Sequence, residues 1–292
     1  MKYVEVVDLP PGQSPVVADA CYRSAQALEA GQILFLPGYG FPVPNSCEAL
    51  FSPTILHKHS KNVSYSPASA KLYGTSSRGP SLLSLREMMA GFADFAQKTV
   101  TRLLPIYRSG LVLARASFRP IEIETRPMPW RKDDTRLQID AFPSSPIQGH
   151  RILKLFCNVN PEGQTHLWRV GEPFEQTAGR FLASIKPPFP FSSAVLMLTS
   201  TTKSRRTVYD HIMLSLQDRM KRDQHYQEEA EQAKVEFPAD STWLAFTDQV
   251  SHAPIRAQYQ LEQTFLLDIG RLHDESTAPL HVLEKLAGRK LV

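Results

Sequence analysis

An aspartate and a histidine that lie far apart in the sequence are the side chains best suited to chemistry. In the segment RLQIDAFPSS, residues 136–145, strand alternation would place Gln138 and Asp140 together on one face. Non-haem iron sites use two imidazoles and one carboxylate, and a strand that carries a histidine and the carboxylate two residues apart directs both toward the metal. Asp140 has this position, and His252 follows 112 residues later in TDQVSHAP. Gln138 stands where the first imidazole would be.

Both residues also have an ordinary structural interpretation. An aspartate on a strand more often makes a hydrogen bond or caps a turn, and a lone histidine more often lies at the surface or in a satisfied core. With a glutamine at position 138, the aspartate and the histidine do not by themselves establish a metal site.

A second group of side chains would bring positive charge into a barrel. In RILKLFCNVNP, Lys154 shares a strand face with Ile152 and Phe156, and a buried ammonium needs an anionic partner. An inward lysine or arginine on a strand is how iron oxygenases hold the distal carboxylate of 2-oxoglutarate. Arg119 lies on a similar polar face in VLARASFRP, and Trp168 could wall the same pocket. The alternatives are a solvated sheet face for the cations and a core position for the tryptophan.

The elements that would position these residues are short strands with helices outside them. Strands are predicted in QILFLPGYG, GLVLARASFRP, TRLQIDAF, RILKLFCNVNP, HLWRV, STWLAFT and AQYQLEQTFLLD. Helices are predicted from Ser14 (N-cap) and Pro15 to Gly31, from a Ser84 and Glu87 capping box to about Leu104, at 173–184, at 204–223 and in APLHVLEKLAG. Residues 41–80 are predicted to be mainly loop with short helical pieces.

This arrangement predicts a mixed α+β fold with a double-stranded β-helix core, of the jelly-roll or cupin type, and flanking helices. We expect a single domain over residues 1–292: a mostly helical and loop elaboration in 1–110, the jelly-roll core in 111–270 and a C-terminal helix in 271–292. No glycine-rich phosphate loop follows a strand, which argues against the usual nucleotide-binding folds.

Composition fits a globular protein in a reducing compartment. Of the 292 residues, 42% are hydrophobic and 21% charged, and the three cysteines form no Cys-x-x-Cys pair, which argues against a disulfide framework and a thiolate zinc site. The sequence has no signal-peptide pattern and no apolar run long enough to span a membrane, so we expect neither export nor membrane insertion. The net charge of +4 mildly favours anionic partners such as acidic glycans, anionic lipid headgroups or nucleic acid.

Taken together, the segments resemble a known family. RASFRP, WRKDDTRL running into DAFPSSP, ILKLFCNVNPEGQ, WRVGEPFE, YDHIML and STWLAFTDQVSHA through LEQTF are similar in order and spacing to the Kdo hydroxylases. The resemblance covers about residues 54–290. It implies an iron(II)- and 2-oxoglutarate-dependent dioxygenase of Gram-negative bacteria that hydroxylates C3 of 3-deoxy-D-manno-oct-2-ulosonic acid (Kdo) in the lipid A inner core. It further implies a cytoplasmic site facing the inner membrane leaflet and ascorbate as an accessory reductant.

The resemblance also assigns site residues, and some of them depart from the family pattern. Asp140 and His252 match the metal carboxylate and the distal histidine, and Gln138 occupies the proximal histidine position. In the 2-oxoglutarate pocket Arg119 and Trp168 match. Lys154 replaces what is usually arginine, and His166 stands where arginine is expected. The resemblance thus gives Gln138, Asp140 and His252 as metal ligands, and Arg119, Lys154, His166 and Trp168 as cofactor-binding residues.

Two hypotheses follow from these departures. The first is a dioxygenase whose activity is impaired because a carboxamide oxygen is a weaker iron ligand than an imidazole. Its partner would be a Kdo-containing lipid A precursor at the membrane surface, with Arg131 and Lys132 as candidates to meet anionic groups, and we expect no nucleic acid and no obligate protein partner. The second is a catalytically inactive jelly-roll relative that binds an anionic glycolipid or acts as a scaffold. A third, an active oxygenase on a different anionic carbohydrate, also remains open.

Overall fold

The computed structural model describes residues 2–9, 16–123, 129–189, 197, 199 and 201–292. The strands are β1 Val4–Val6, β2 Ile33–Leu36, β3 Val63–Ser66, β4 Lys71–Tyr73, β5 Leu111–Arg119, β6 Arg151–Asn158, β7 His166–Gly171, β8 Gln232–Phe237, β9 Ser241–Phe246, β10 His252–Arg256 and β11 Gln260–Leu267. The helices are α1 Ala18–Glu29, α2 Gly79–Leu103, α3 Phe174–Phe181, α5 Val208–Arg222, α6 Gln224–Glu229 and α7 Pro279–Ala287. Short 3-10 turns connect them, among them η4 Trp130–Lys132.

The strands form two sheets, as the predicted jelly roll requires. The major sheet has eight strands in the order β1-β2-β9-β6-β11-β5-β3-β4, and the minor sheet has three in the order β10-β7-β8. All pairs within the two sheets are antiparallel except β1 with β2. Strands that are consecutive in the minor sheet are far apart in the sequence, which is how a jelly roll brings distant residues to one interior. The fold class is therefore a mixed α+β jelly roll.

An aromatic layer fills part of the space between the two sheets. Phe156 and Trp243 of the major sheet stack on each other, and Trp168 of the minor sheet meets both rings edge-on. All three side chains are buried. Alternation along β6 and β7 places these rings on the interior face, so the same alternation decides which polar residues of these strands face inward.

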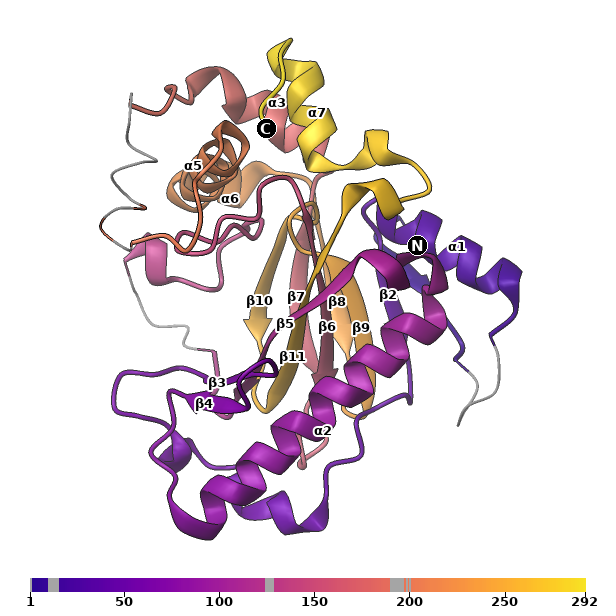
Figure 1. The fold of residues 1–292 in the computed structure, drawn as a ribbon, viewed down its shortest axis with the longest axis vertical. Helices are drawn as coiled ribbons and strands as arrows, with labels where there is room; N and C mark the ends of the chain where they lie inside the picture. Colours follow the sequence, from indigo (N-terminus) through magenta and orange to yellow (C-terminus); the bar gives the residue numbers. More distant parts are fainter. Residues whose placement is uncertain (1, 10–15, 124–128, 190–196, 198, 200) are drawn as a thin grey trace.

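The helices cover the remaining surfaces of the sheets (Figure 1). Helix α2 crosses the outer face of the major sheet and buries a stripe that includes Leu85, Met88 and Phe92, which join one core cluster with residues of β5, β6 and β11. Helices α3, α5, α6 and α7 gather at one end of the sheets, and their apolar faces pack on Leu137 and Ile139. These helices thus form a platform against which the segment that carries Gln138 and Asp140 packs.

Several boundaries differ from the sequence-based expectation. The described part of residues 1–110 is mainly helix and loop, but β1, β3 and β4 were not expected, and they extend the major sheet at its two edges. Helix α2 begins at Gly79, with Pro80 in its first turn, rather than at the Ser84 and Glu87 box. The proposed helix start at Ser14 and Pro15 lies outside the described residues. Strands β8 and β10 were not expected, since β8 is a polar edge strand and β10 contains Pro254.

The described part of the chain contains no helix that is both long and apolar enough to cross a membrane.

Candidate functional site

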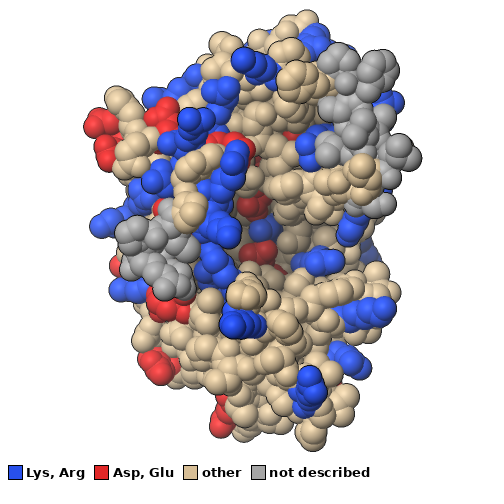
Figure 2. All heavy atoms as spheres, turned by 90° about the vertical axis from the view of Figure 1, so that its left-hand side faces the viewer, with Lys and Arg blue, Asp and Glu red and all other residues tan. Residues whose placement is uncertain are grey.

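A cavity of about 250 Å³ opens between the two sheets. Figure 2 shows the face with this hollow, where acidic and basic atoms lie side by side on the floor and Lys and Arg side chains gather along one border. The cavity is lined by Lys61, Asn62, Ser117, Arg119, Ile123, Asp134, Gln138, Asp140, Lys154, Phe156, Trp168, His252, Pro254, Gln260 and Glu262. Six of the seven predicted site residues are in this set, so strands that are distant in sequence do converge there.

Backbone pairing with β10 brings Gln138, Asp140 and His252 to one cavity. Gln138 N donates to His252 O at 3.0 Å, and His252 N donates to Gln138 O at 2.9 Å. Residues directly opposite in an antiparallel pair project to the same side, so both side chains face the cavity. Asp140 follows two residues later on the same side, where its N donates to Thr247 O at 2.7 Å. The expected strand is thus reduced to a single bridge plus one flanking hydrogen bond.

Two glutamine side chains from the helical platform hold the other edge of this segment. Gln227 of α6 accepts from Leu137 N at 2.8 Å and donates to Leu137 O at 3.0 Å, as a neighbouring strand would. Gln217 of α5 donates to Ile139 O at 2.9 Å. Because these backbone groups are buried, leaving them unpaired would be costly. The two glutamines therefore fix the position of Gln138 and Asp140.

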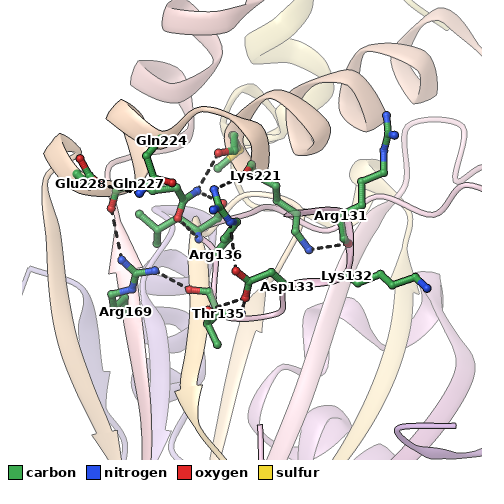
Figure 3. Close-up of polar contacts among 12 residues, drawn as sticks. Arg131, Lys132, Asp133, Thr135, Arg136, Arg169, Lys221, Gln224, Gln227 and Glu228 are labelled. Atoms are coloured by element: carbon green, nitrogen blue, oxygen red, sulfur yellow. Dashed lines mark hydrogen bonds and ion pairs between the residues drawn. The ribbon is translucent and has the colours of Figure 1, made fainter. Parts of the chain in front are cut away.

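Further polar contacts tie the preceding residues to the same helices (Figure 3). Arg136 pairs with Asp133 at 3.2 Å and donates to Lys221 O at 2.9 Å, while Lys221 Nζ donates to Arg131 O at 3.1 Å. Arg169 of β7 donates to Thr135 O at 2.5 Å. These three cations hold the loop before the site in place through hydrogen bonds to its backbone and side chains. Lys221 can be buried because its ammonium has such a partner.

His252 presents one ring nitrogen to a ligand. Nδ1 lies 2.8 Å from Val250 O, so it donates a hydrogen bond and leaves Nε2 with its lone pair in the neutral ring. Burial lowers the pKa of His252, and attraction by Asp140 only partly offsets this. The ring stacks on Trp168 with 5.2 Å between ring centroids. His252 is therefore a neutral, oriented imidazole, as a metal ligand must be.

Lys154 joins the two sheets across the cavity through a pair of carboxylates. Its Nζ lies 2.9 Å from Asp140 Oδ2 and 2.9 Å from Glu262 Oε1. Burial alone would lower the pKa of Lys154, but Asp140 and Glu262 outweigh burial and raise it. Burial would likewise raise the pKa of Asp140, and Lys154 holds it below the usual value. Lys154 and Asp140 are therefore both charged at neutral pH.

A second ion-pair cluster lies on the same wall. Asp134 Oδ2 accepts hydrogen bonds from both terminal nitrogens of Arg119 at 3.2 Å and from Lys61 Nζ at 3.0 Å. Burial raises the pKa of Asp134, but Arg119 and Lys61 together bring it below the usual value. Among the described residues, the charged lysine, arginine, aspartate and glutamate side chains lining the cavity are thus three cations and three carboxylates, and their charges cancel.

His166 does not reach the cavity. Its side chain is buried, its Nε2 lies 2.7 Å from Gln258 O, and its ring meets Trp243 edge-on at 5.9 Å between centroids. Burial lowers its pKa to about 4, so the ring is neutral near pH 7. Alternation correctly places His166 on the interior face with Trp168, but the short imidazole ends in the aromatic layer behind the cavity wall. The structure therefore does not place this predicted cofactor-binding residue with the others.

The cavity wall contains buried polar atoms that no other protein atom satisfies. Each of these atoms lacks a hydrogen bond of good geometry although its residue lines the cavity: Asn62 Oδ1, Arg119 Nε, Asp140 Oδ2, Trp168 Nε1 and Gln260 Oε1. For Asp140 the contact with Lys154 is an ion pair rather than an aligned hydrogen bond. Buried polar groups in native proteins are almost always paired, so their concentration here indicates a site for a polar ligand.

The residues present fit a divalent metal ion, with one weak position. Asp140 offers a carboxylate whose Oδ2 is ion-paired with Lys154 but has no aligned hydrogen bond, His252 offers Nε2, and Gln138 offers an amide oxygen to the same cavity. Within the described residues no group of three or more His, Cys, Asp or Glu side chains is arranged to hold a metal. That result follows from Gln138, because the third ligand here is an amide rather than an imidazole.

Sequence reasoning missed several residues of this cavity, namely Lys61, Asn62, Asp134, Gln260 and Glu262. For Gln260 and Glu262 a signal existed, since they alternate with buried Leu261 along β11 just as Lys154 alternates with Leu153 and Leu155 on β6. Lys61, Asn62 and Asp134 lie in loops or a turn, where no strand periodicity indicates which side chains face inward.

Comparison with known proteins gives one family. A family model described as 3-deoxy-D-manno-oct-2-ulosonic acid (Kdo) hydroxylase matches residues 13–290. The crystal structure of the Kdo hydroxylase KdoO, a non-heme Fe(II) alphaketoglutarate-dependent dioxygenase, in complex with alphaketoglutarate and Fe(III) is similar with a TM-score of 0.95 and 39% identity, covering 99% of this chain and 97% of that one. The complexes of KdoO with cobalt(II) and with succinate and Fe(III) match at 40% identity over the same shares, with TM-scores of 0.95 and 0.94. No curated protein matches the chain.

Proposed function

The chain belongs to the Kdo hydroxylase family, and we propose that it is an iron(II)- and 2-oxoglutarate-dependent dioxygenase that hydroxylates C3 of a Kdo residue. The observation that carries the proposal is the convergence of Asp140 and His252, 112 residues apart, with Gln138 in one cavity between the sheets. The match to solved dioxygenases over nearly the whole chain favours this function over an inactive relative.

The metal would be held by Asp140, His252 and Gln138. When bound, iron(II) and 2-oxoglutarate supply the oxygen activation that no amino-acid side chain provides. The chain's own contribution is to orient the ligands: Val250 O fixes the tautomer of His252, and Thr247 O fixes the backbone at Asp140. Gln138 is the weak ligand, so we expect lower metal affinity than a histidine at this position would give.

The co-substrate would be held by Arg119, Lys154 and Trp168. Arg119 and Lys154 bring positive charge to the cavity, and Trp168 Nε1 is a buried donor without a partner. Lysine offers a single point charge where arginine would offer a two-pronged contact, which weakens the hold on a carboxylate. His166 takes no part, because its ring lies behind the wall.

The substrate would be a Kdo-containing lipid A precursor approached from the membrane surface. A second groove of about 340 Å³ combines Trp130, Ile185 and Phe189 with cations, and Phe189 is 87% exposed. Its charged residues are Arg131, Lys186, Arg219 and Arg222 against a single Asp218. Aromatic and basic side chains together suit anionic headgroups. Family membership alone supports a cytoplasmic site at the inner leaflet of a Gram-negative cell and ascorbate as an accessory reductant.

Anaerobic titration with iron(II) in the presence of 2-oxoglutarate tests the proposal. We expect a visible metal-to-ligand charge-transfer band in the wild type and none in Asp140→Asn, which keeps the shape of the side chain but loses its charge. Mass spectrometry of the lipopolysaccharide inner core, from cells with and without the protein, should then show a Kdo that has gained one oxygen atom. Absence of the band at saturating iron would rule out the dioxygenase.

A further inference from the structure

We propose that Lys154 is an internal cation that competes with the metal for Asp140, and that the carboxylate of the co-substrate relieves this competition. The inference rests on the proposed function, since it concerns how the same cavity takes up its metal. It predicts that metal alone binds poorly and that an organic dicarboxylate prepares the site.

The fold holds Lys154 between two carboxylates from different sheets. Glu262 lies opposite Phe156 in the register of β6 and β11, so it is a diagonal neighbour of Lys154 on the same face. Asp140 approaches from the segment that pairs with β10 of the minor sheet. Side-chain exposures of 13% for Lys154, 12% for Asp140 and 22% for Glu262 leave little water to screen the charges.

The ammonium already occupies the oxygen that a metal would need. Lys154 Nζ lies 2.9 Å from Asp140 Oδ2, the buried carboxylate oxygen without an aligned hydrogen bond. A divalent cation bound to that carboxylate would lie close to a second positive charge in a poorly screened cavity, which is strongly unfavourable. A metal at Asp140 therefore competes with Lys154, and its binding is favoured when Lys154 moves away from this carboxylate.

The charge balance of the cavity explains why the co-substrate would help. The three cations and three carboxylates that the described residues bring to the lining cancel. Relative to this balance, a divalent metal alone adds two positive charges and a dicarboxylate alone adds two negative charges. Both together restore neutrality. A bound carboxylate would also give Lys154 a new partner in place of Asp140, while Glu262 remains as its second.

Lysine is suited to this exchange and arginine is not. A lysine carries a point charge on a flexible stem and can move from one carboxylate to another, whereas arginine has a planar group with fixed donor directions. The family resemblance leads one to expect arginine at position 154. The competition is thus a property of this chain's lysine rather than of the fold.

Calorimetric titration with cobalt(II), without any organic acid, tests the competition. We expect Lys154→Met to bind cobalt(II) about tenfold more tightly than the wild type. The matched control is Lys61→Met, which removes a cation from the same cavity that pairs with Asp134 instead, and we expect less than a twofold change. Thermal unfolding of each variant verifies that it folds.

Glutarate tests the second half of the inference, because it has two carboxylates but no keto oxygen with which to chelate a metal. In the wild type, saturating glutarate should tighten cobalt(II) binding about tenfold, and in Lys154→Arg the effect should be smaller. This comparison holds even if Lys154→Met fails to fold. Equal cobalt(II) affinity in the wild type with and without glutarate, and in Lys154→Met, would overturn the inference and leave the proposed function intact. Failure of cobalt(II) to bind the wild type or any variant, Gln138→His included, would overturn both.

Discussion

At the scale of single residues, the proposed metal site combines an aspartate and a histidine with an amide at the third position. Asp140 and His252 keep the ionisation states that metal binding requires, because Lys154 keeps the carboxylate charged and burial keeps the imidazole neutral. Gln138 has the right orientation, since its backbone pairs with His252, but its oxygen is a weak donor. The weakness proposed for this metal site is therefore one of ligand chemistry rather than of position.

Replacing Gln138 with histidine should strengthen metal binding. The backbone already directs this side chain into the cavity, so an imidazole there can reach the metal without rearrangement of the segment. We expect cobalt(II) affinity to rise by about tenfold or more, measured by calorimetry with 2-oxoglutarate present. Gln138→Leu, which has no donor atom, should not strengthen binding. Unchanged affinity in Gln138→His would show that this position does not contribute a ligand.

The buried His166 should make stability fall in mild acid. Its pKa is about 4 in the folded chain against about 6.5 when exposed, so the unfolded state takes up the proton first as pH falls. Stability is complete above about pH 6.5 and declines until pH reaches the folded value, by about 3 kcal/mol. Urea unfolding at pH 7 and pH 4 should show a smaller loss for His166→Gln, which can still donate to Gln258 O. An equal loss in both proteins would mean that His166 is not buried.

At the scale of elements, the segment with Gln138 and Asp140 is held from two sides rather than built into a sheet. One backbone bridge joins it to β10, and the side chains of Gln217 and Gln227 complete its other edge. Such a segment keeps strand-like alternation without a regular strand. The site consequently depends on helices α5 and α6 as much as on the sheets.

Gln227→Leu should weaken both the fold and the site. The substitution leaves Leu137 N and O buried without partners, which we expect to cost about 1 to 3 kcal/mol in the free energy of unfolding. Because Leu137 adjoins Gln138, cobalt(II) affinity should fall as well. Gln224→Leu is the control, since the side chain of this exposed glutamine on the same helix donates to Glu228 and not to the segment with Leu137. The two readouts are urea unfolding and calorimetry, and similar results for both variants would contradict the role given to Gln227.

At the scale of the whole molecule, two sheets and a helical platform enclose a cavity whose charges cancel, while a basic and aromatic groove lies apart on the surface. The cavity suits a metal together with a dianion, and the groove suits an anionic surface. The proposed function thus assigns the chemistry to the cavity and the contact with a lipid-linked substrate to the groove.

Binding to anionic vesicles should depend on the groove. Lys186→Gln with Arg222→Gln removes two exposed cations, each worth about 1 kcal/mol at a charged membrane, so partitioning onto phosphatidylglycerol vesicles should fall by about tenfold or more. Arg86→Gln with Lys98→Gln removes two exposed cations from α2 and should have little effect. Co-sedimentation at low salt measures both. Loss of binding in both double variants to the same extent would argue against the groove.

The sequence was most informative where alternation applied. The period of two placed Gln138 and Asp140 on one strand face and left the face of Lys154 either interior or solvated, and the structure brings all three into one cavity. It could not supply the partner of Lys154, because Glu262 becomes a neighbour only through the register of β6 and β11, which periodicity does not determine. The sequence also could not show how far an inward side chain reaches. His166 and Trp168 share a strand face, but of these two only Trp168 reaches the cavity.

The local sequence also failed to indicate that β8 and β10 are strands. Strand β10 is five residues long and contains a proline, so its local sequence indicates a loop, and tertiary pairing with β7 overrides that preference. The same pairing orients His252. The element that completes the site is thus the one for which local sequence gave least information.

The most direct test of the account is an anomalous difference map from a crystal soaked with cobalt(II) and 2-oxoglutarate. The account predicts one cobalt peak within coordinating distance of Asp140 and His252, with the Lys154 ammonium moved from Asp140 to a carboxylate of the co-substrate. A map with no peak at these residues, and with Lys154 still paired to Asp140 at saturating ligand, would contradict it.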